Sequence, residues 1–206
     1  NWNRPVIDED GTSFKDLIAD CMAGEGCPSY LDYGNVPIGC WDTSDVTDMS
    51  FAFSRDASYD PNYFNQAINC WNVASVTSMR SIFNDAVDFN QPLNDWNTAS
   101  VTTMENMFQG AIDFNQPLDD WNVASVTDMN RMFWQATTFN QPLDDWNVAS
   151  VTDMNGMFRL ASKFNQPLDD WNVASVTDMY SMFERATDFN QPLDDWNVVS
   201  VTSMDA

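Results

Sequence analysis

The sequence contains no histidine, and it has only 8 basic residues against 31 acidic ones. Without histidine there is no imidazole general base, no Ser-His-Asp or Cys-His nucleophile pair, and no zinc site with an imidazole ligand. The formal net charge of −23 repels polyanions, which argues against nucleic acid and anionic membrane surfaces as partners. Most familiar enzyme classes are therefore excluded.

Long apolar runs are also missing. No segment approaches the ~20 apolar residues of a membrane-spanning helix, and the first five residues lack the charged and apolar parts of a signal peptide. We expect a mature, soluble chain without membrane insertion. Its 206 residues are 44% hydrophobic and 14% aromatic, which is enough apolar material for one folded unit with a sizeable core.

Internal repetition dominates what is present. Tryptophans recur every 25 residues from Trp71 to Trp196, and Trp41 lies 30 residues before Trp71 because its unit carries five extra residues within 54–63. A fixed period of this length is typical of a stacked array of repeats. The sequence therefore predicts about six and a half stacked repeats over 41–206, open at the C-terminal end.

Each repeat divides into two halves with different periodicity. Met179, Met182, Phe183 and Ala186 have the i, i+3, i+4, i+7 spacing of one helical face, and Thr177 precedes them as a candidate N-cap. In the other half, a proline introduces an L-x-x-W-x-V-x-x-V pattern, which favours a strand. We predict an α/β fold: a leucine-rich-repeat-like right-handed solenoid with a parallel strand ladder on one side and short helices on the other.

Stacked repeats would place identical side chains in columns ~4.8 Å apart. We expect Trp, Phe, Leu and Met columns to form the core, and the equivalents of Asn190 and Gln191 to hydrogen-bond along the stack. Positions that differ between repeats, such as Asn155-Gly156 against Tyr180-Ser181, fall on the opposite face of the expected helix. We expect these variable positions to face solvent.

Residues 1–40 do not follow the repeat, and they hold five of the seven glycines. A single apolar helical stripe runs through this segment, formed by Phe14, Leu17, Ile18, Cys21 and Met22. The sequence therefore predicts an N-terminal capping segment whose amphipathic helix covers the first repeat.

The repeated motif D-W-N-V-A-S-V-T-D-M-x-x-M-F-x-x-A-x-x-F-N-Q-P-L, as at 145–168, resembles the repeats of BspA-type leucine-rich-repeat surface proteins. The resemblance extends over 39–206. It implies a secreted or cell-surface protein that is used for adhesion or has an unknown role, and it carries over no catalytic residue.

Four cysteines suit an extracellular chain with disulfides. Cys40 and Cys70 each directly precede a tryptophan, so they would lie on adjacent coils within the ~4.4–6.8 Å Cα range of a disulfide. We predict a Cys40–Cys70 disulfide, and a Cys21–Cys27 disulfide that closes the turn between them. An all-cysteine zinc site and reactive thiols are the alternatives.

The predicted binding surface is acidic. Carboxylates precede the later tryptophans in pairs, and carboxylates ~4.8 Å apart repel by about 1 kcal/mol even in water, which favours a bound cation. Ca²⁺ is the candidate because it takes carboxylate and amide oxygens, although no EF-hand spacing is present. A solvated acidic face is the alternative, and we expect no other cofactor. The candidate binding residues are Asp95, Asp120, Asp145, Asp170, Asp195, Asn97, Asn122, Asn147 and Asn172, with Asp144, Asp145, Asp169 and Asp170 as candidate calcium ligands.

Three further patterns have a competing interpretation. The threonine column that includes Thr152 suggests ice binding, but helix capping explains the same residues. The tryptophan column suggests a strip for stacking sugars, but its spacing with Leu and Val favours a core. Paired carboxylates suggest glycoside hydrolysis, but that reaction needs one acid with a raised pKa in a cleft. We do not expect an enzyme.

The leading hypothesis is a non-catalytic extracellular or cell-surface repeat protein that serves adhesion, protein binding or structural assembly. Its partner would be a protein or glycan surface, or a second copy that docks head to tail on the apolar end around Trp196, Val198, Val201 and Met204. The alternative is an ice-binding or calcium-dependent structural protein that uses the Thr or Asp columns.

Overall fold

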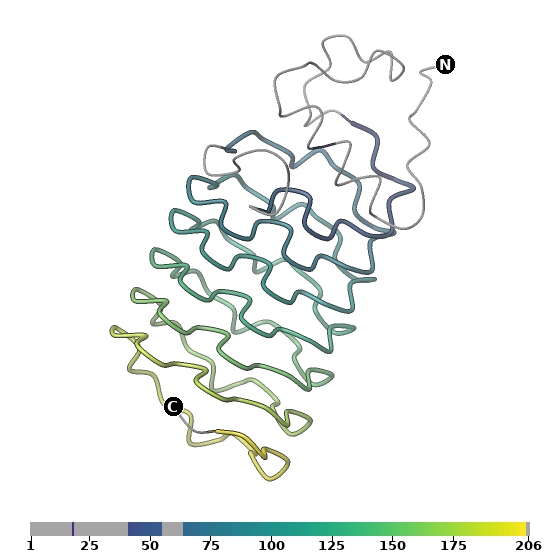
Figure 1. Ribbon diagram of the computed structural model, residues 1–206. Coiled ribbons are helices and arrows are strands. Elements are labelled where there is room, and N and C mark those ends of the chain that lie inside the picture. The colour runs from purple at the N-terminus through teal and green to yellow at the C-terminus, as the bar shows by residue number, and fades with distance from the viewer. Residues whose placement is uncertain (1–17, 19–40, 55–63, 205–206) are drawn as a thin grey trace.

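The computed structural model describes residues 18, 41–54 and 64–204, and the repeats form a stack of similar coils (Figure 1). We count a coil from one of the recurring tryptophans, which is position 1. Position 8 of each coil forms a parallel bridge with position 8 of the next, in the order Asp48, Ser78, Thr103, Asp128, Asp153, Asp178 and Ser203. From Ser78 onward the bridged residues are 25 apart, so one coil consumes one sequence repeat.

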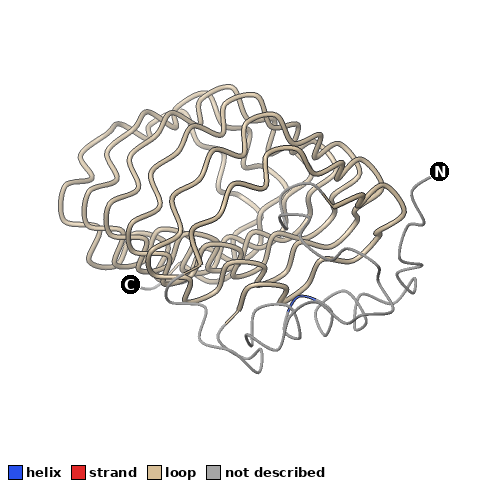
Figure 2. Cartoon of the chain, turned by 90° about the horizontal axis from the view of Figure 1, so that it is seen from above, coloured by secondary structure: helices blue, strands red, loops and turns tan. Residues whose placement is uncertain are grey.

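The coils are built of turns. Within 41–54 and 64–204 no residue belongs to a helix or to an extended strand, and each coil contributes only the isolated bridge at position 8 (Figure 2). The predicted α/β solenoid, with a parallel strand ladder on one side and short helices on the other, is therefore wrong. The hydrogen bonds of the two halves show which structures they form instead.

In the half predicted as a helix, the backbone has positive φ at positions 11 and 15, which interrupts a right-handed helix. The residues with φ between 54° and 70° are Phe51, Ser81, Asp85, Asn106, Gly110, Arg131, Gln135, Gly156, Leu160, Ser181 and Arg185. Alternate N–H groups turn back by three residues, as from Trp134 to the Arg131 carbonyl (3.1 Å), or reach the next coil, as from Arg131 to the Asn155 carbonyl (2.8 Å). A segment this short does not hold a helix by itself, so the bonds between coils win.

The inward positions were nevertheless predicted correctly. Met129, Met132, Phe133 and Ala136 are each fully buried, as are their equivalents in most other described coils. Because the positive-φ residues recur every fourth residue, the overlapping turns return the chain to the interior with the same spacing that a helix would give. The periodicity is thus real, although the helix is not.

The predicted aromatic columns are confirmed. Consecutive indoles from Trp71 to Trp196 stack with 6.4–6.5 Å between ring centroids and 2–3° between ring planes. The phenylalanines at position 13, such as Phe133, stack at 5.5–5.7 Å. Both separations exceed the ~4.8 Å step of paired strands. Burial of these rings supplies the largest apolar contribution to the core.

On the tryptophan side, side chains join the coils. The Trp146 Nε1–H donates to the Leu118 carbonyl (3.0 Å), and the Ser150 hydroxyl donates to the Ala124 carbonyl (2.8 Å). Backbone bonds across this side are sparse; the Thr152 N–H donates to the Thr127 carbonyl at 2.8 Å. Because side chains replace most of the backbone pairing, no strand ladder forms where the sequence predicted one.

The predicted bonds of the Asn-Gln pairs are also confirmed. The Asn140 Oδ1 accepts hydrogen bonds from the Asn165 N–H and from the Gln166 Nε2–H, both at 2.9 Å. The same arrangement joins Asn165 to the next coil. No backbone carbonyl among the described residues accepts a bond from the Asn165 N–H. The Asn140 column therefore satisfies this backbone donor as well as the glutamine amide.

The Asn140→Ala variant is expected to lower the free energy of unfolding by about 1–2 kcal/mol, because a half-buried N–H and an amide lose their shared acceptor. The matched control is Asn155→Ala, whose side chain makes no hydrogen bond among the described residues and which we expect to stay within about 0.5 kcal/mol. Urea titration measures both. Equal effects of the two substitutions would contradict the assignment.

Of the expected capping segment, only Ile18 is described. It is in helical conformation and is fully buried in the same hydrophobic cluster as the coils. The other residues of the predicted helix lie outside the described residues, so the capping helix itself stays a prediction.

Candidate functional site: a variable face on the coil stack

One face of the stack carries residues that differ from coil to coil. We call this the variable face, and it consists of positions 10, 11, 14 and 15. From the second coil onward its residues are Arg80, Ser81, Asn84, Asp85, Glu105, Asn106, Gln109, Gly110, Asn130, Arg131, Trp134, Gln135, Asn155, Gly156, Arg159, Leu160, Tyr180, Ser181, Glu184 and Arg185.

Backbone hydrogen bonds join the coils along the whole variable face, and side-chain ion pairs join them at some coils only. Between the coils that begin at Trp121 and Trp146, the N–H groups of Met129, Arg131, Phe133 and Gln135 donate to the next coil at 2.8–3.0 Å. The same four bonds recur between earlier coils. A backbone hydrogen bond can form whatever non-proline side chain the residue carries. These bonds therefore leave the side chains on this face free to vary.

The invariant exposed residues are explained in a different way, because their side chains carry the bonds between and within coils. The predicted binding residues Asn97, Asn122, Asn147 and Asn172 each accept a hydrogen bond from the backbone N–H two residues later, at 3.1–3.2 Å. These four asparagines therefore shape turns, as Asn side chains commonly do. Their repetition needs no ligand.

The threonine column is also structural. The prediction of helix N-caps is wrong, because no helix follows these residues in the described coils. Instead the Thr152 hydroxyl donates to the Thr127 carbonyl (3.1 Å), and Thr177 bonds to Thr152 in the same way. The repeated hydroxyls thus serve inter-coil bonds. Ice binding by this column stays a prediction.

The acidic columns lie where the sequence placed them, at the surface before each tryptophan. The exposed carboxylates are those of Asp95, Asp119, Asp120, Asp144, Asp145, Asp169, Asp170, Asp194 and Asp195. Asn94 donates from its amide to the Asp120 carboxylate. In the part of the chain that the structure describes, no group of three or more acidic or cysteine side chains is arranged to hold a metal ion. Calcium binding stays a prediction.

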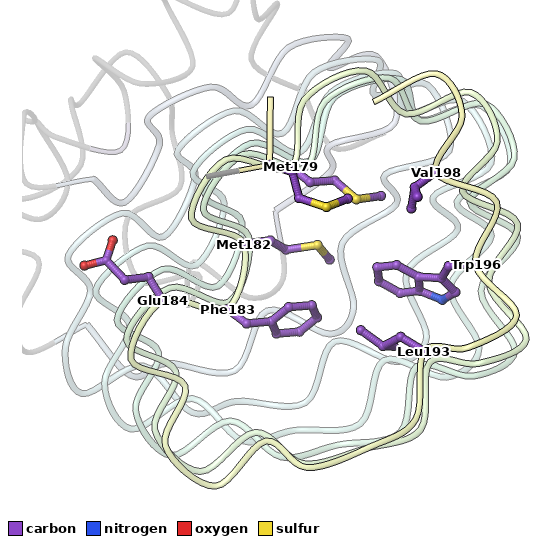
Figure 3. A pocket seen from close by; sticks show the side chains of 8 residues that line it. Met179, Met182, Phe183, Glu184, Leu193, Trp196 and Val198 are labelled. Atoms are coloured by element: carbon purple, nitrogen blue, oxygen red, sulfur yellow. The ribbon is translucent and has the colours of Figure 1, made fainter. Parts of the chain in front are cut away.

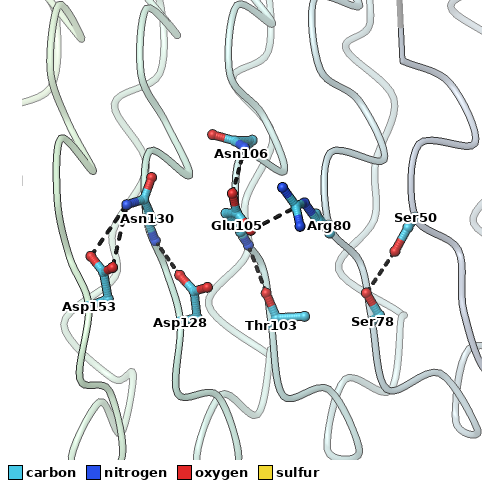
Figure 4. A network of polar contacts seen from close by, with 9 residues as sticks. All are labelled: Ser50, Ser78, Arg80, Thr103, Glu105, Asn106, Asp128, Asn130 and Asp153. Carbon is cyan, nitrogen blue, oxygen red and sulfur yellow. Dashed lines mark hydrogen bonds and ion pairs between the residues drawn. The ribbon is translucent and has the colours of Figure 1, made fainter. Parts of the chain in front are cut away.

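Polar side chains on and beside the variable face form several separate groups of contacts (Figure 4). The Asn130 N–H donates to Asp128 (2.9 Å), and its side-chain amide reaches Asp153 (3.4 Å). Burial raises the pKa of the Asp128 carboxyl above its ordinary value, and the Asp153 charge acts in the same direction, while the bond from Asn130 and the charge of Arg80 oppose it. Position 8 is therefore a place where carboxylates stack closely enough to interact.

The basic residues of the stack concentrate on this face. Four of the five that follow Trp71 lie on it, and Lys163 lies just beyond. Arg80 pairs with Glu105 (3.2 Å), Arg159 with Glu184 (3.0 Å), and Lys163 with Asp188 (3.0 Å). Among the residues that the structure describes, no basic side chain forms an ion pair with the acidic columns, so the two sides differ in charge pattern.

Not all variable positions face solvent, as the sequence had suggested. Ser81 and Ser181 are only 3% and 2% exposed, and Gly156 is also buried. All three occupy position 11, where the positive φ turns the chain inward against the next coil. The exposed variable positions are mainly 10 and 15, of which Tyr180 at position 10 is 45% exposed.

Trp134 is the residue that the sequence analysis missed. It lies at position 14, outside the 25-residue register of the other repeat tryptophans, and this break in the period was the available signal. The guanidinium of Arg131 lies 4.8 Å from the centre of its ring, and that of Arg159 lies 5.1 Å away. Two cations therefore lie over one indole, and each contact stabilises the cluster.

The predicted assembly end is an apolar hollow of about 430 Å³. Trp196, Val198 and Met204 line it together with Met179 and Phe183, while Val201 packs against the core. Figure 3 shows the labelled apolar side chains pointing into the ring of the coil and Glu184 pointing away from it. Head-to-tail docking on this end stays a prediction.

Cys70 is exposed and carries a free thiol, so the predicted Cys40–Cys70 disulfide is not formed in this structure. The predicted Cys21–Cys27 disulfide lies outside the described residues, as does Cys40. Within the described chain, no helix is long and apolar enough to cross a membrane.

Comparison with known proteins adds a family but no function. No curated protein and no solved structure matches the chain. The model of one family, described as "Mycoplasma protein of unknown function, DUF285", matches residues 29–137 and again 113–206. The two matches together span most of the chain, so this protein belongs to the DUF285 family, which is a BspA-like repeat family.

Proposed function

We propose that the protein is a non-catalytic binding protein of the BspA surface-protein type, which acts outside the cell or on its surface and recognises a protein partner through the variable face. One observation carries the proposal: four backbone N–H groups per coil join the variable face whatever side chains it carries, whereas elsewhere repeated side chains such as those of Trp146, Ser150 and Gln166 make the bonds between coils. Ion pairs such as Arg80–Glu105 add to the backbone bonds at some coils only. The backbone bonds therefore leave recognition free to select most side chains on this face.

The composition of the variable face supports this proposal. It presents Arg80, Arg131, Trp134 and Tyr180 on a chain that otherwise has few basic residues. Arg, Trp and Tyr are the residue types that contribute most binding energy at protein interfaces. Extracellular adhesion is what the resemblance to BspA-type surface proteins implies, and the family description leaves the role open.

The test uses substitutions that the chain itself tolerates at the same position. In the double variant Arg80→Ser with Tyr180→Asn, each residue takes an identity found at position 10 of another coil, so folding should be preserved. We would screen the unmodified chain on arrays of purified extracellular proteins and glycans, and then measure both proteins against the ligands found. We expect a protein ligand whose affinity falls by about tenfold or more in the double variant.

The matched control is Asp145→Asn with Asp170→Asn, which removes two charges from the acidic columns. We expect this control to keep the affinity of the unmodified chain. Loss of binding in the control with full binding by the double variant would place recognition on the acidic columns and overturn the proposal. The absence of any protein ligand on the arrays would also count against it.

A further inference from the structure

We infer that Arg131, held over Trp134, is an anchor point for an acidic side chain of the protein partner. The inference rests on the proposed function, because it names the chemical group of the partner that one part of the variable face binds. It also stands on its own observations, which concern three neighbouring side chains and one glycine: Arg131, Trp134, Arg159 and Gly156.

Arg131 carries a positive charge that the fold does not neutralise. No carboxylate among the described residues lies within ion-pair distance of its guanidinium, whereas Arg80, Arg159, Lys163 and Arg185 each have one. Arg131 is also exposed. On a chain with a net charge of −23, an exposed guanidinium without a carboxylate partner is unusual, and it leaves a fork of donors for a planar anion.

The side chain of Arg131 is held in place before any partner arrives. Its guanidinium lies 4.8 Å from the centre of the Trp134 ring. Its stem lies beside the next coil, because a Cβ added at Gly156 would be in ordinary van der Waals contact with the Arg131 Cγ at 3.4 Å. Ordering the side chain in advance lowers the entropy lost on binding.

A second guanidinium lies over the same indole. The Arg159 guanidinium lies 5.1 Å from the ring centre, and its Nη2 is pinned by Glu184 at 3.0 Å. Two donors in this cluster, the Trp134 Nε1–H and the Arg159 Nε–H, are buried without an acceptor. Buried donors without acceptors are rare in folded proteins and call for an explanation. Both donors belong to the cluster that contains the Arg131 guanidinium, so a carboxylate bound to Arg131 would bring an acceptor to this cluster.

The chemistry favours a single carboxylate over a polyanion. Arg131 offers one uncompensated charge, and the surrounding chain is strongly acidic, so a sulfated glycan or nucleic acid would meet repulsion beyond this point. At physiological salt, charges interact over only about 8 Å, so one acidic side chain set in a neutral or basic protein surface avoids that repulsion. The partner is therefore expected to present one Asp or Glu to Arg131.

The first test needs no knowledge of the partner. A short peptide with one glutamate in a neutral sequence is titrated into the full chain at physiological salt, and the same peptide with glutamine serves as the control probe. We expect the Arg131 Nε–H and Trp134 Nε1–H nuclear magnetic resonance signals to shift with the glutamate peptide and to stay in place with the glutamine peptide. Equal shifts with both peptides, or no shift of either signal, would overturn the inference.

Variants separate this site from a general effect of charge. Arg131→Ala is expected to abolish the shift of the Trp134 signal, and Arg131→Lys to weaken binding about threefold, because lysine keeps the charge but loses the bidentate fork. Lys163→Thr removes an equal charge just beyond the variable face, at a place where the preceding coil carries Thr138, and should leave the titration unchanged. A sulfated monosaccharide that binds the unmodified chain more tightly than the glutamate peptide would assign the site to glycans and overturn the inference.

The failure of this inference differs from the failure of the proposed function. If a protein ligand depends on Arg80 and Tyr180 while Arg131→Ala binds it as well as the unmodified chain, the variable face is the binding surface but Arg131 is not its anchor. If Arg131 binds the glutamate peptide but no ligand depends on the variable face, the anchor is real and the proposed function is wrong.

Discussion

Replacing Trp146 by alanine is expected to lower the free energy of unfolding by about 3–5 kcal/mol, which is a large share of what a domain of this size has. Trp146 is only 3% exposed, and its ring stacks on Trp121 and Trp171 at 6.5 and 6.4 Å. Truncation would leave a ring-sized void between two coils and remove the Nε1–H bond to Leu118. Urea unfolding followed by circular dichroism measures the loss.

Two control variants separate the contributions to this effect. Trp146→Phe keeps an aromatic ring in the column and loses only size and the Nε1–H donor, so we expect a loss of about 1–2 kcal/mol. The Leu118 carbonyl would still accept from the Trp121 N–H at 3.1 Å. Trp196→Ala, in the last described coil, removes a less buried ring and should cost less than Trp146→Ala. A loss below about 1 kcal/mol for Trp146→Ala would mean that the column is a surface strip and not the core.

Glycine at Gln135 is expected to raise the free energy of unfolding by about 1 kcal/mol, and valine there to lower it by at least about 1 kcal/mol. Gln135 has a φ of 62°, where glycine carries no steric penalty and a β-branched residue is strongly disfavoured. Its side chain is exposed, so packing changes little. A difference of about 2 kcal/mol between the two variants is therefore a backbone effect.

This pair of variants also discriminates between turns and the helix that the sequence suggested. In a helix interior, glycine would be the worse residue, because it costs about 1 kcal/mol relative to alanine and valine costs less. The structure predicts the opposite order. Thermal unfolding of the two variants beside the unmodified chain decides it, and valine more stable than glycine would restore the helix.

The period and the core were accessible from the sequence because each depends on side-chain hydrophobicity alone. Spacing of Met129, Met132, Phe133 and Ala136 identified the inward residues, and these are buried. The Asn140 column was also predictable, since an amide that recurs at every coil finds its equivalent one coil away. Such features follow from the repeat itself and do not depend on the backbone conformation between the inward residues.

The candidate site was less predictable. The sequence directed attention to the acidic residues and to Asn147-type positions, because repetition looked like function. In the structure the repeated asparagines shape turns, and the repeated hydroxyls join coils. Trp134 and Arg131, which do not repeat, were overlooked although they contact each other. Repetition of the asparagines and hydroxyls thus marks residues that shape the coils or join them, and cannot by itself be taken as a sign of function.

The amino-acid sequence by itself determined that 25 residues make one coil and which side chains enter the interior. Only the tertiary structure decided the backbone conformation, because each N–H at positions 9, 11, 13 and 15 has a choice between an acceptor four residues back and one in the next coil. That second acceptor lies about one repeat away in the chain, so no local pattern reveals that it is present. When the coils stack, these N–H groups bond to carbonyls of the next coil. The positive φ at residues such as Gln135 is the backbone conformation that goes with these bonds.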